Sequence, residues 1–227
     1  MQDWSTFRRE QDRIHAEFEV SMQCALAKGL DTDPLAASGR QAYTVVLQPE
    51  QEVREVFALL AEEVMRVVPG ALIYPKHDEI HATLARCLYF PEGPARKIAD
   101  LAAVNTLVET LLPRLPRLWC EHGGYIFGQT NLIAKGIPKP AYLDVAQELV
   151  EASRKAGLRL KLSWGLHSTI ARFTKKTDPE VAQMLAHLIR ELRFRIPVQT
   201  YTFSEIRVGW VFVDKKLGVE PHYRFPL

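Results

Sequence analysis

The segment His81-Ala82-Thr83-Leu84-Ala85-Arg86 occurs a second time as His167-Ser168-Thr169-Ile170-Ala171-Arg172, with two conservative changes. The second copy begins 86 positions after the first. A match to this pattern arises by chance in fewer than roughly one chain in a thousand, and two matches are far rarer. The repetition therefore indicates an internal duplication, or a strong functional demand on both segments.

The spacing of the histidine and the threonine fits a β-strand. Alternate side chains of a strand share a face, roughly 6.6 Å apart along it. His81 and Thr83 are therefore expected on one face, with Leu84 on the opposite face toward the core. The second copy repeats this with His167, Thr169 and Ile170. If an approximate two-fold axis relates the two halves, both polar faces meet at one groove.

Such a groove offers the groups that phosphodiester chemistry needs. One imidazole takes a proton from the attacking oxygen, and the other protonates the leaving oxygen. Histidine suits both roles because its ordinary pKa of about 6.5 allows either form near neutrality. The threonine hydroxyls can hold the non-bridging oxygens. This scheme requires no metal and no cofactor, and we expect neither.

These paired H-x-[ST]-hydrophobic motifs resemble those of the two-histidine (2H) phosphoesterase superfamily, which includes the bacterial RNA 2′,3′-cyclic phosphodiesterases, also called 2′–5′ RNA ligases. The resemblance covers roughly residues 42–213. It implies that His81 and His167 are the catalytic acid–base pair, and that Thr83 and Thr169 hold the substrate phosphate.

The pattern along the chain predicts an α+β fold. Residues 1 to about 30 show helical spacing of apolar positions, which ends at Asp31-Thr32-Asp33-Pro34. Strand-like segments then alternate with helix-like ones. The predicted strands are at residues 42–47, 72–74, 80–90, 118–120, 125–127, 131–133, 165–173 and 203–213, and the predicted helices are at about 49–69, 95–112, 141–156 and 179–192. We expect an N-terminal helical extension over 1–40 and a bilobal 2H phosphoesterase domain over 41–227. Its two pseudo-symmetric lobes, each an antiparallel sheet flanked by helices, would form a central groove.

Composition narrows the class of protein. The chain has 227 residues, of which 47% are hydrophobic and 25% charged, with a formal net charge of +2. These values are typical of a globular protein and too balanced for a general nucleic-acid coat. The sequence has no membrane span and no secretory signal, and its three cysteines lack metal-site or disulfide spacing. We expect a cytoplasmic monomer.

Further residues are candidates for substrate contact. Strict alternation puts Arg86 and Arg172 on the core side, so they reach phosphate only if their strands bend; otherwise they form structural ion pairs. A run of basic residues between Arg154 and Lys176 contains no acid and overlaps the second motif, so it could attract an anion. Among the nearby aromatic residues, Tyr43 is the best candidate to stack on a nucleobase; the others are Tyr125, Trp164, Phe173 and Trp210.

The predicted function is metal-independent hydrolysis of a nucleotide or RNA-end phosphodiester, either a 2′,3′-cyclic phosphate or a 2′–5′ linkage. Two alternatives stay open. The groove could bind nucleotides without turning them over. His77, Glu79 and His81 would share one face of a strand, so a metal-dependent phosphoesterase is the other alternative.

Overall fold

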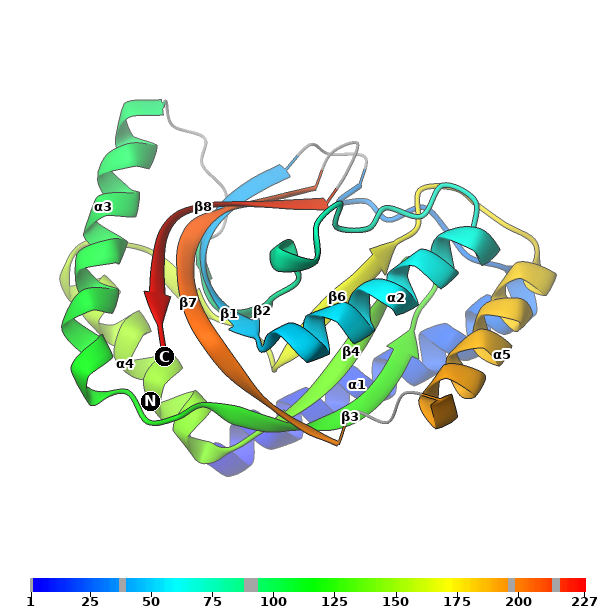
Figure 1. Cartoon of the computed structure of the whole chain (residues 1–227), viewed down its shortest axis with the longest axis horizontal. Coiled ribbons are helices and arrows are strands. Elements are labelled where there is room, and N and C mark those ends of the chain that lie inside the picture. Colours follow the sequence, from blue (N-terminus) through cyan, green and yellow to red (C-terminus); the bar gives the residue numbers. More distant parts are fainter. Residues whose placement is uncertain (1, 37–39, 88–93, 196–198, 214–216) are drawn as a thin grey trace.

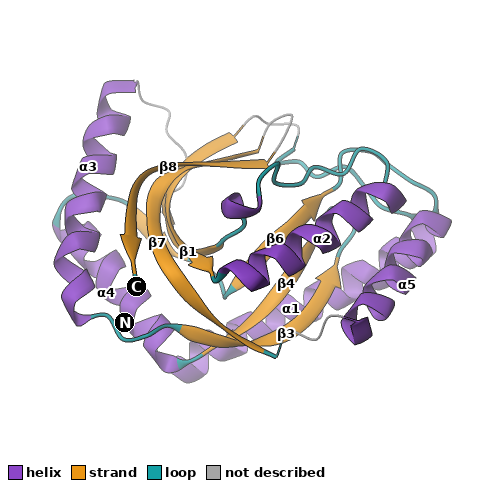
Figure 2. Cartoon of the chain, in the orientation of Figure 1, coloured by secondary structure: helices purple, strands orange, loops and turns teal. Residues whose placement is uncertain are grey.

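A computed structural model describes residues 2–36, 40–87, 94–195, 199–213 and 217–227. Helices and strands are mixed along the chain, as Figures 1 and 2 show. In chain order the elements are α1 (Trp4–Lys28), β1 (Arg40–Pro49), α2 (Gln51–Val67), β2 (Ala82–Cys87), α3 (Pro94–Leu111), β3 (Trp119–Phe127), β4 (Asn131–Pro138), α4 (Pro140–Lys155), β5 (Leu160–Leu162), β6 (His167–Arg172), α5 (Pro179–Arg195), β7 (Thr200–Val213) and β8 (Leu217–Pro226). The α+β class predicted from the sequence is therefore confirmed.

The strands form one antiparallel sheet that closes on itself. Its order is β1-β2-β6-β4-β3-β7-β8, and β7 also pairs with β1, so the path returns to its start like a barrel. The strand β7 makes this closure possible because it is long. Its first residues pair with β3, and the rest lie between β1 and β8. The two motif strands, β2 and β6, are neighbours in this sheet.

The helices cover the sheet on opposite faces. In Figure 1, α2 lies in front of β6 and β4, while α1 lies behind β3 and β4, and α3 and α4 lie together at the other end of the molecule. Each helix buries apolar residues, although Leu59, predicted on the apolar side of α2, is exposed. The buried residues of α2 are Val53, Phe57, Ala58, Leu60, Ala61 and Val64.

The N-terminal helix is packed into the fold. Asp3 caps it by accepting a hydrogen bond from the backbone N of Thr6. Phe7 is buried beside the ring of Tyr142 on α4. Gln11 is also buried, and its Nε2 donates to the carbonyl oxygen of Gly136 on β4 at 2.7 Å. This helix therefore covers an apolar surface of the fold.

Several segments differ from the sequence prediction. The strand expected near residues 72–74 is reduced to a single bridge between Leu72 and Arg172. Residues 118–127, expected as two strands, contain the one strand β3. The predicted strand through residue 90 is described only to Cys87, since residues 88–93 lie outside the described part. The strands β5 and β8 have no counterpart in the prediction, because β5 is only three residues long and β8 carries many polar residues.

Candidate active site

The two motifs meet where β2 and β6 pair. Ala82 is level with Ser168, and the strands are antiparallel, so His81 lies beside Thr169 and Thr83 lies beside His167. The two histidines occupy diagonal positions, for which backbone separations of roughly 7–8 Å are typical. All four side chains line one pocket of about 150 Å³. The structure thus brings the predicted acid–base pair and both predicted hydroxyls together.

A β-bulge in each motif turns its arginine toward this pocket. On β2, Thr83 pairs with Val46 and Ala85 pairs with Val45, so Leu84 is an extra residue without a partner on β1. On β6, Thr169 pairs with Ile133 and Ala171 with Leu132, which leaves Ile170 extra. An extra residue shifts the alternation by one position.

The shift has the same consequence in both motifs. Arg86 falls on the face of Thr83, and Arg172 falls on the face of Thr169; both arginines line the pocket. Leu84 and Ile170 are buried on the core side, as predicted. Arg172 also forms an ion pair with Asp33, with Nη1 to Oδ2 at 2.5 Å, so it lines the pocket and takes part in a structural ion pair.

His81 is held in place by its backbone neighbours. Its side chain is buried, and its Nδ1 lies 2.8 Å from the carbonyl oxygen of Glu79. A carbonyl can only accept a hydrogen bond, so Nδ1 carries the proton and Nε2 is the nitrogen that can take one up. Tyr74 packs edge-on against the ring. Burial lowers the pKa of His81 to about 4, and nearby Arg207 and Arg172 act in the same direction.

The carbonyl that anchors His81 belongs to a short 3₁₀ turn, His77–Glu79. Two buried side chains fix this turn, because Gln48 and Arg207 both donate to the carbonyl oxygen of Asp78. Arg207 is paired in addition with Glu205. Residues of β1 and β7 therefore hold the segment that orients the first histidine.

His167 has a different environment. Its ring stacks on Trp164 with a centroid distance of 4.3 Å and an interplanar angle of 16°. Trp164 in turn contacts His15 and Phe18 of α1. Burial lowers the pKa of His167 to about 3, and the positive charge of Arg172 adds to this shift. In the ligand-free site both catalytic candidates are thus neutral near pH 7.

The structure adds pocket residues that the motifs did not reveal. Tyr74 and Ser163 line the pocket, and Ser163 Oγ donates to the carbonyl oxygen of Gly165 at 2.9 Å. Burial raises the pKa of Tyr74 to about 12, so its hydroxyl stays protonated. Outside the pocket, the Tyr142 hydroxyl donates to the backbone oxygen of Thr83 at 3.0 Å and so fixes that strand. Only proximity in the fold identifies these residues, because none lies within a motif.

The candidacy of Tyr43 as a base-stacking residue is wrong. Its side chain is only 1% exposed and packs edge-on against Trp210, while its neighbours Ala42 and Thr44 line the pocket. Because side chains alternate along β1, Tyr43 points to the face of the sheet opposite the pocket. Tyr125, Phe173 and Trp210 are not among the pocket-lining residues either, and Trp164 stacks on His167.

Much of the basic run is paired with carboxylates. Arg154 and Lys155 lie near Glu151, and Lys176 lies 3.8 Å from Asp31. Among the basic residues of this run, Arg172 is the one that lines the pocket. The run therefore does not form one continuous surface at the site.

The segment before the first motif does not have the geometry assumed for a metal site. His77 and Glu79 lie in the 3₁₀ turn, so strand alternation does not place them on one face with His81. Across the described ranges, no group of three or more histidine, cysteine, aspartate or glutamate side chains is arranged to hold a metal ion.

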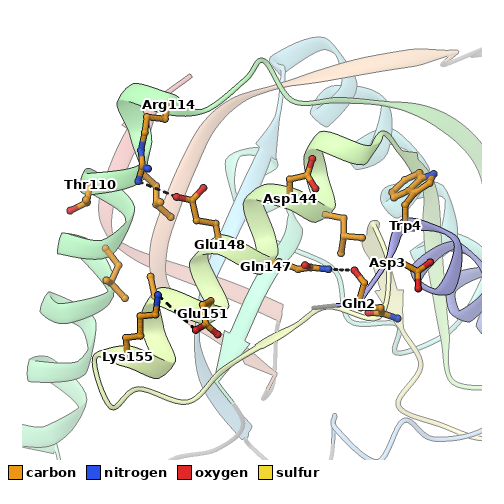
Figure 3. A pocket seen from close by; sticks show the side chains of 14 residues that line it. Gln2, Asp3, Trp4, Thr110, Arg114, Asp144, Gln147, Glu148, Glu151 and Lys155 are labelled. Atoms are coloured by element: carbon orange, nitrogen blue, oxygen red, sulfur yellow. Dashed lines mark hydrogen bonds and ion pairs between the residues drawn. The ribbon is translucent and has the colours of Figure 1, made fainter.

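A larger hollow of about 700 Å³ lies between α3, α4 and the start of α1 (Figure 3). Several of its polar side chains have partners within the lining. Arg114 lies 3.0 Å from Glu148, Lys155 lies near Glu151, and Gln147 donates to the backbone oxygen of Gln2. Among the described residues that line it there is no histidine, so acid–base chemistry points to the smaller pocket between the motifs.

Comparison with known proteins agrees with this fold. No family model and no curated protein matches the sequence. Among solved structures, TT0787 of Thermus thermophilus is similar at a TM-score of 0.50 and 18% identity, over 82% of this chain and 97% of the other. Escherichia coli LigT, solved with 3′-AMP, is similar at a TM-score of 0.49 and 17% identity, over 84% and 99%.

The likeness to TT0787 shows that the present chain has the fold of that protein. Within the described residues, each helix is too short or too polar to cross a bilayer.

Proposed function

We propose that this protein is a phosphodiesterase that uses His81 and His167 as its acid–base pair and needs no metal. The observation that carries the proposal is the pairing of β2 with β6, which sets both histidines and both threonines around one pocket. Two proton-transfer groups beside two hydroxyls and two arginines suit a reacting phosphate group.

The proposed reaction is hydrolysis. Water attacks the phosphorus, and one imidazole takes a proton from it while the new P–O bond forms. The other imidazole gives a proton to the ribose oxygen as its bond to phosphorus breaks. The product is a phosphomonoester, and the pair must return one proton from the first ring to the second before the next turnover. Thr83, Thr169, Arg86 and Arg172 hold the non-bridging oxygens.

The proposed substrate is a nucleotide or RNA end with a 2′,3′-cyclic phosphate or a 2′–5′ linkage. The resemblance of the two motifs to those of the RNA 2′,3′-cyclic phosphodiesterases supports this class. A volume of about 150 Å³ holds a phosphate and part of a ribose, and it is below the roughly 300–1,000 Å³ of pockets that enclose whole ligands. We therefore expect the base to lie at the pocket mouth.

A substrate panel tests this proposal. The purified protein is incubated with 2′,3′-cyclic, 3′,5′-cyclic and 2′–5′-linked nucleotides in excess EDTA, and products are identified by mass. We expect a phosphomonoester from the 2′,3′-cyclic or 2′–5′ substrate, with a rate unchanged by EDTA. Binding without product would favour a nucleotide-binding module, and loss of activity in EDTA would favour metal-dependent chemistry.

A further inference from the structure

The loop that follows α1 lies against the end of the second motif strand. The backbone N of Asp33 donates to the carbonyl oxygen of Phe173 at 2.8 Å. The backbone N of Thr177 donates to the carbonyl oxygen of Leu30 at 3.1 Å. These bonds hold the loop beside the pocket, and Leu35 is one of the pocket-lining residues. The N-terminal segment therefore contributes to the wall of the site.

Within this loop, Asp33 is fixed at both carboxylate oxygens. Oδ1 accepts a hydrogen bond from the backbone N of Leu35 at 2.7 Å, and Oδ2 accepts one from Arg172 Nη1 at 2.5 Å. The residue is only 2% exposed. A buried carboxylate with both oxygens engaged has a set position, so its arginine partner is held as well.

The guanidinium of Arg172 keeps capacity for a second anion. It carries five N–H donors, and Asp33 is its side-chain acceptor in the described part of the chain. The same side chain lines the pocket together with both histidines. A guanidinium anchored on one side binds an incoming phosphate with less loss of side-chain freedom than an unanchored one.

We propose that Asp33 is a positioning residue, which holds the Arg172 guanidinium toward the phosphate of the substrate. The loop after α1 thereby completes the anion-binding part of the pocket. That the bound anion is a substrate phosphate rests on the proposed function. The contact between Asp33 and Arg172 is seen in the structure and does not depend on any reaction.

The test measures the Kd of 3′-AMP by isothermal titration calorimetry for the full chain and two matched variants. Asp33→Asn keeps the shape of the side chain and removes its charge. Asp31→Asn makes the same change two positions earlier, where the carboxylate lies near Lys176 and does not line the pocket. We expect Asp33→Asn to raise Kd about tenfold or more, and Asp31→Asn to change it less than about twofold.

A double-mutant cycle separates positioning from a general structural effect. If Asp33 acts through Arg172, Asp33→Asn causes no further loss in an Arg172→Gln background. A loss of the same size in both backgrounds would contradict the proposal. If Asp33→Asn fails to fold in a thermal scan, Asp33→Glu replaces it, because it keeps the charge and displaces the carboxylate by one methylene.

The outcomes distinguish this inference from the proposed function. Equal Kd values for Asp33→Asn and Asp31→Asn would overturn the inference and leave the catalytic proposal intact. Binding of 3′-AMP with the expected variant pattern, but no hydrolysis of 2′,3′-cyclic AMP, would overturn the catalytic proposal alone. A wild-type protein that does not bind 3′-AMP would overturn the inference, since Arg172 would then hold no such phosphate.

Discussion

At the scale of single residues, burial controls the protonation of the two histidines. Their pKa values in the ligand-free site, about 4 for His81 and about 3 for His167, leave both rings neutral near pH 7. A general acid must carry a proton, so the proposed reaction depends on how the substrate changes these values. A bound phosphate is negatively charged and favours the imidazolium form, which raises both pKa values.

This gives a prediction for the pH dependence of the reaction. The profile of kcat/KM reports the free protein, and the profile of kcat reports the complex. Between pH 4 and pH 9 we expect kcat/KM to fall as the pH rises, because both free-protein pKa values lie at or below about 4. We expect the kcat profile to be bell-shaped, with its limbs at higher pH. Steady-state rates between pH 4 and pH 9 check this, and superimposable profiles would contradict it.

The sequence predicted which face of the strand these residues occupy wherever the side chains alternate strictly between the two faces. The pattern correctly placed His81, Thr83 and Leu84, and their equivalents in the second motif, on opposite faces of a strand. It could not place the two arginines, because the bulges at Leu84 and Ile170 are visible only through the register of the neighbouring strands. It misplaced Tyr43, whose face depends on how β1 pairs.

At the scale of elements, the end of α1 is held tightly against the loop before α5. Gly29 has a φ of 88°, and a Cβ there would lie 1.8 Å from the backbone oxygen of Thr177. Gly157, at the end of α4, has a similar φ of 75° with open space around it. At both positions a residue with a Cβ would therefore be strained, but the two positions differ in the room available for a side chain.

We therefore predict unequal effects of Gly29→Ala and Gly157→Ala. Gly157→Ala should lower the free energy of unfolding by about 1 kcal/mol, from backbone strain alone. Gly29→Ala should cost clearly more, because the end of α1 or the backbone at Thr177 has to move. Urea unfolding of both variants provides the comparison; equal losses would show that α1 does not end in a tight contact.

The stack between α1 and the second motif gives another prediction. Trp164 lies between the rings of α1 and His167, so Trp164→Ala should expose His167 and raise its pKa toward 6.5. Trp119→Ala removes an exposed indole on β3 and serves as the control. NMR titration of the His167 ring measures the shift, and an unchanged His167 pKa in Trp164→Ala would contradict this account.

Sequence pattern identified the major helices but was less useful for the sheet. Apolar spacing and the proline and glycine positions located the helices to within a few residues. The closure of the sheet depends on β7, whose length allows it to pair with β1, β3 and β8, and no local pattern encodes these partners. At Asp33 the local pattern indicates only the end of a helix, because its partner Arg172 is 139 positions away.

At the scale of the whole molecule, the buried histidines link stability to pH. Burial lowers the pKa of His15 and His81 to about 4 and that of His167 to about 3, whereas the ordinary value is 6.5. Below pH 6.5 the unfolded chain therefore binds more protons than the folded one. Stability is complete above pH 6.5 and falls as the pH drops toward 4.

The variant His167→Gln should weaken this dependence because it removes one of the three groups. His187→Gln is the control, since His187 is exposed on α5. The measurement is the urea midpoint at pH 7.5 and at pH 5.0. The difference between the two midpoints should shrink for His167→Gln and stay at the wild-type value for His187→Gln; equal differences would contradict the prediction.

The most direct test of the account is a single-turnover measurement of 2′,3′-cyclic AMP hydrolysis by the wild type, His81→Ala, His167→Ala and the double variant. Thermal unfolding confirms that each variant is folded. If the two rings act as one unit on one phosphorus atom, each single substitution lowers the rate by about 10²–10⁴-fold, and the double variant is little slower than the slower single one. A folded single variant that hydrolyses the substrate at nearly the wild-type rate would contradict the account.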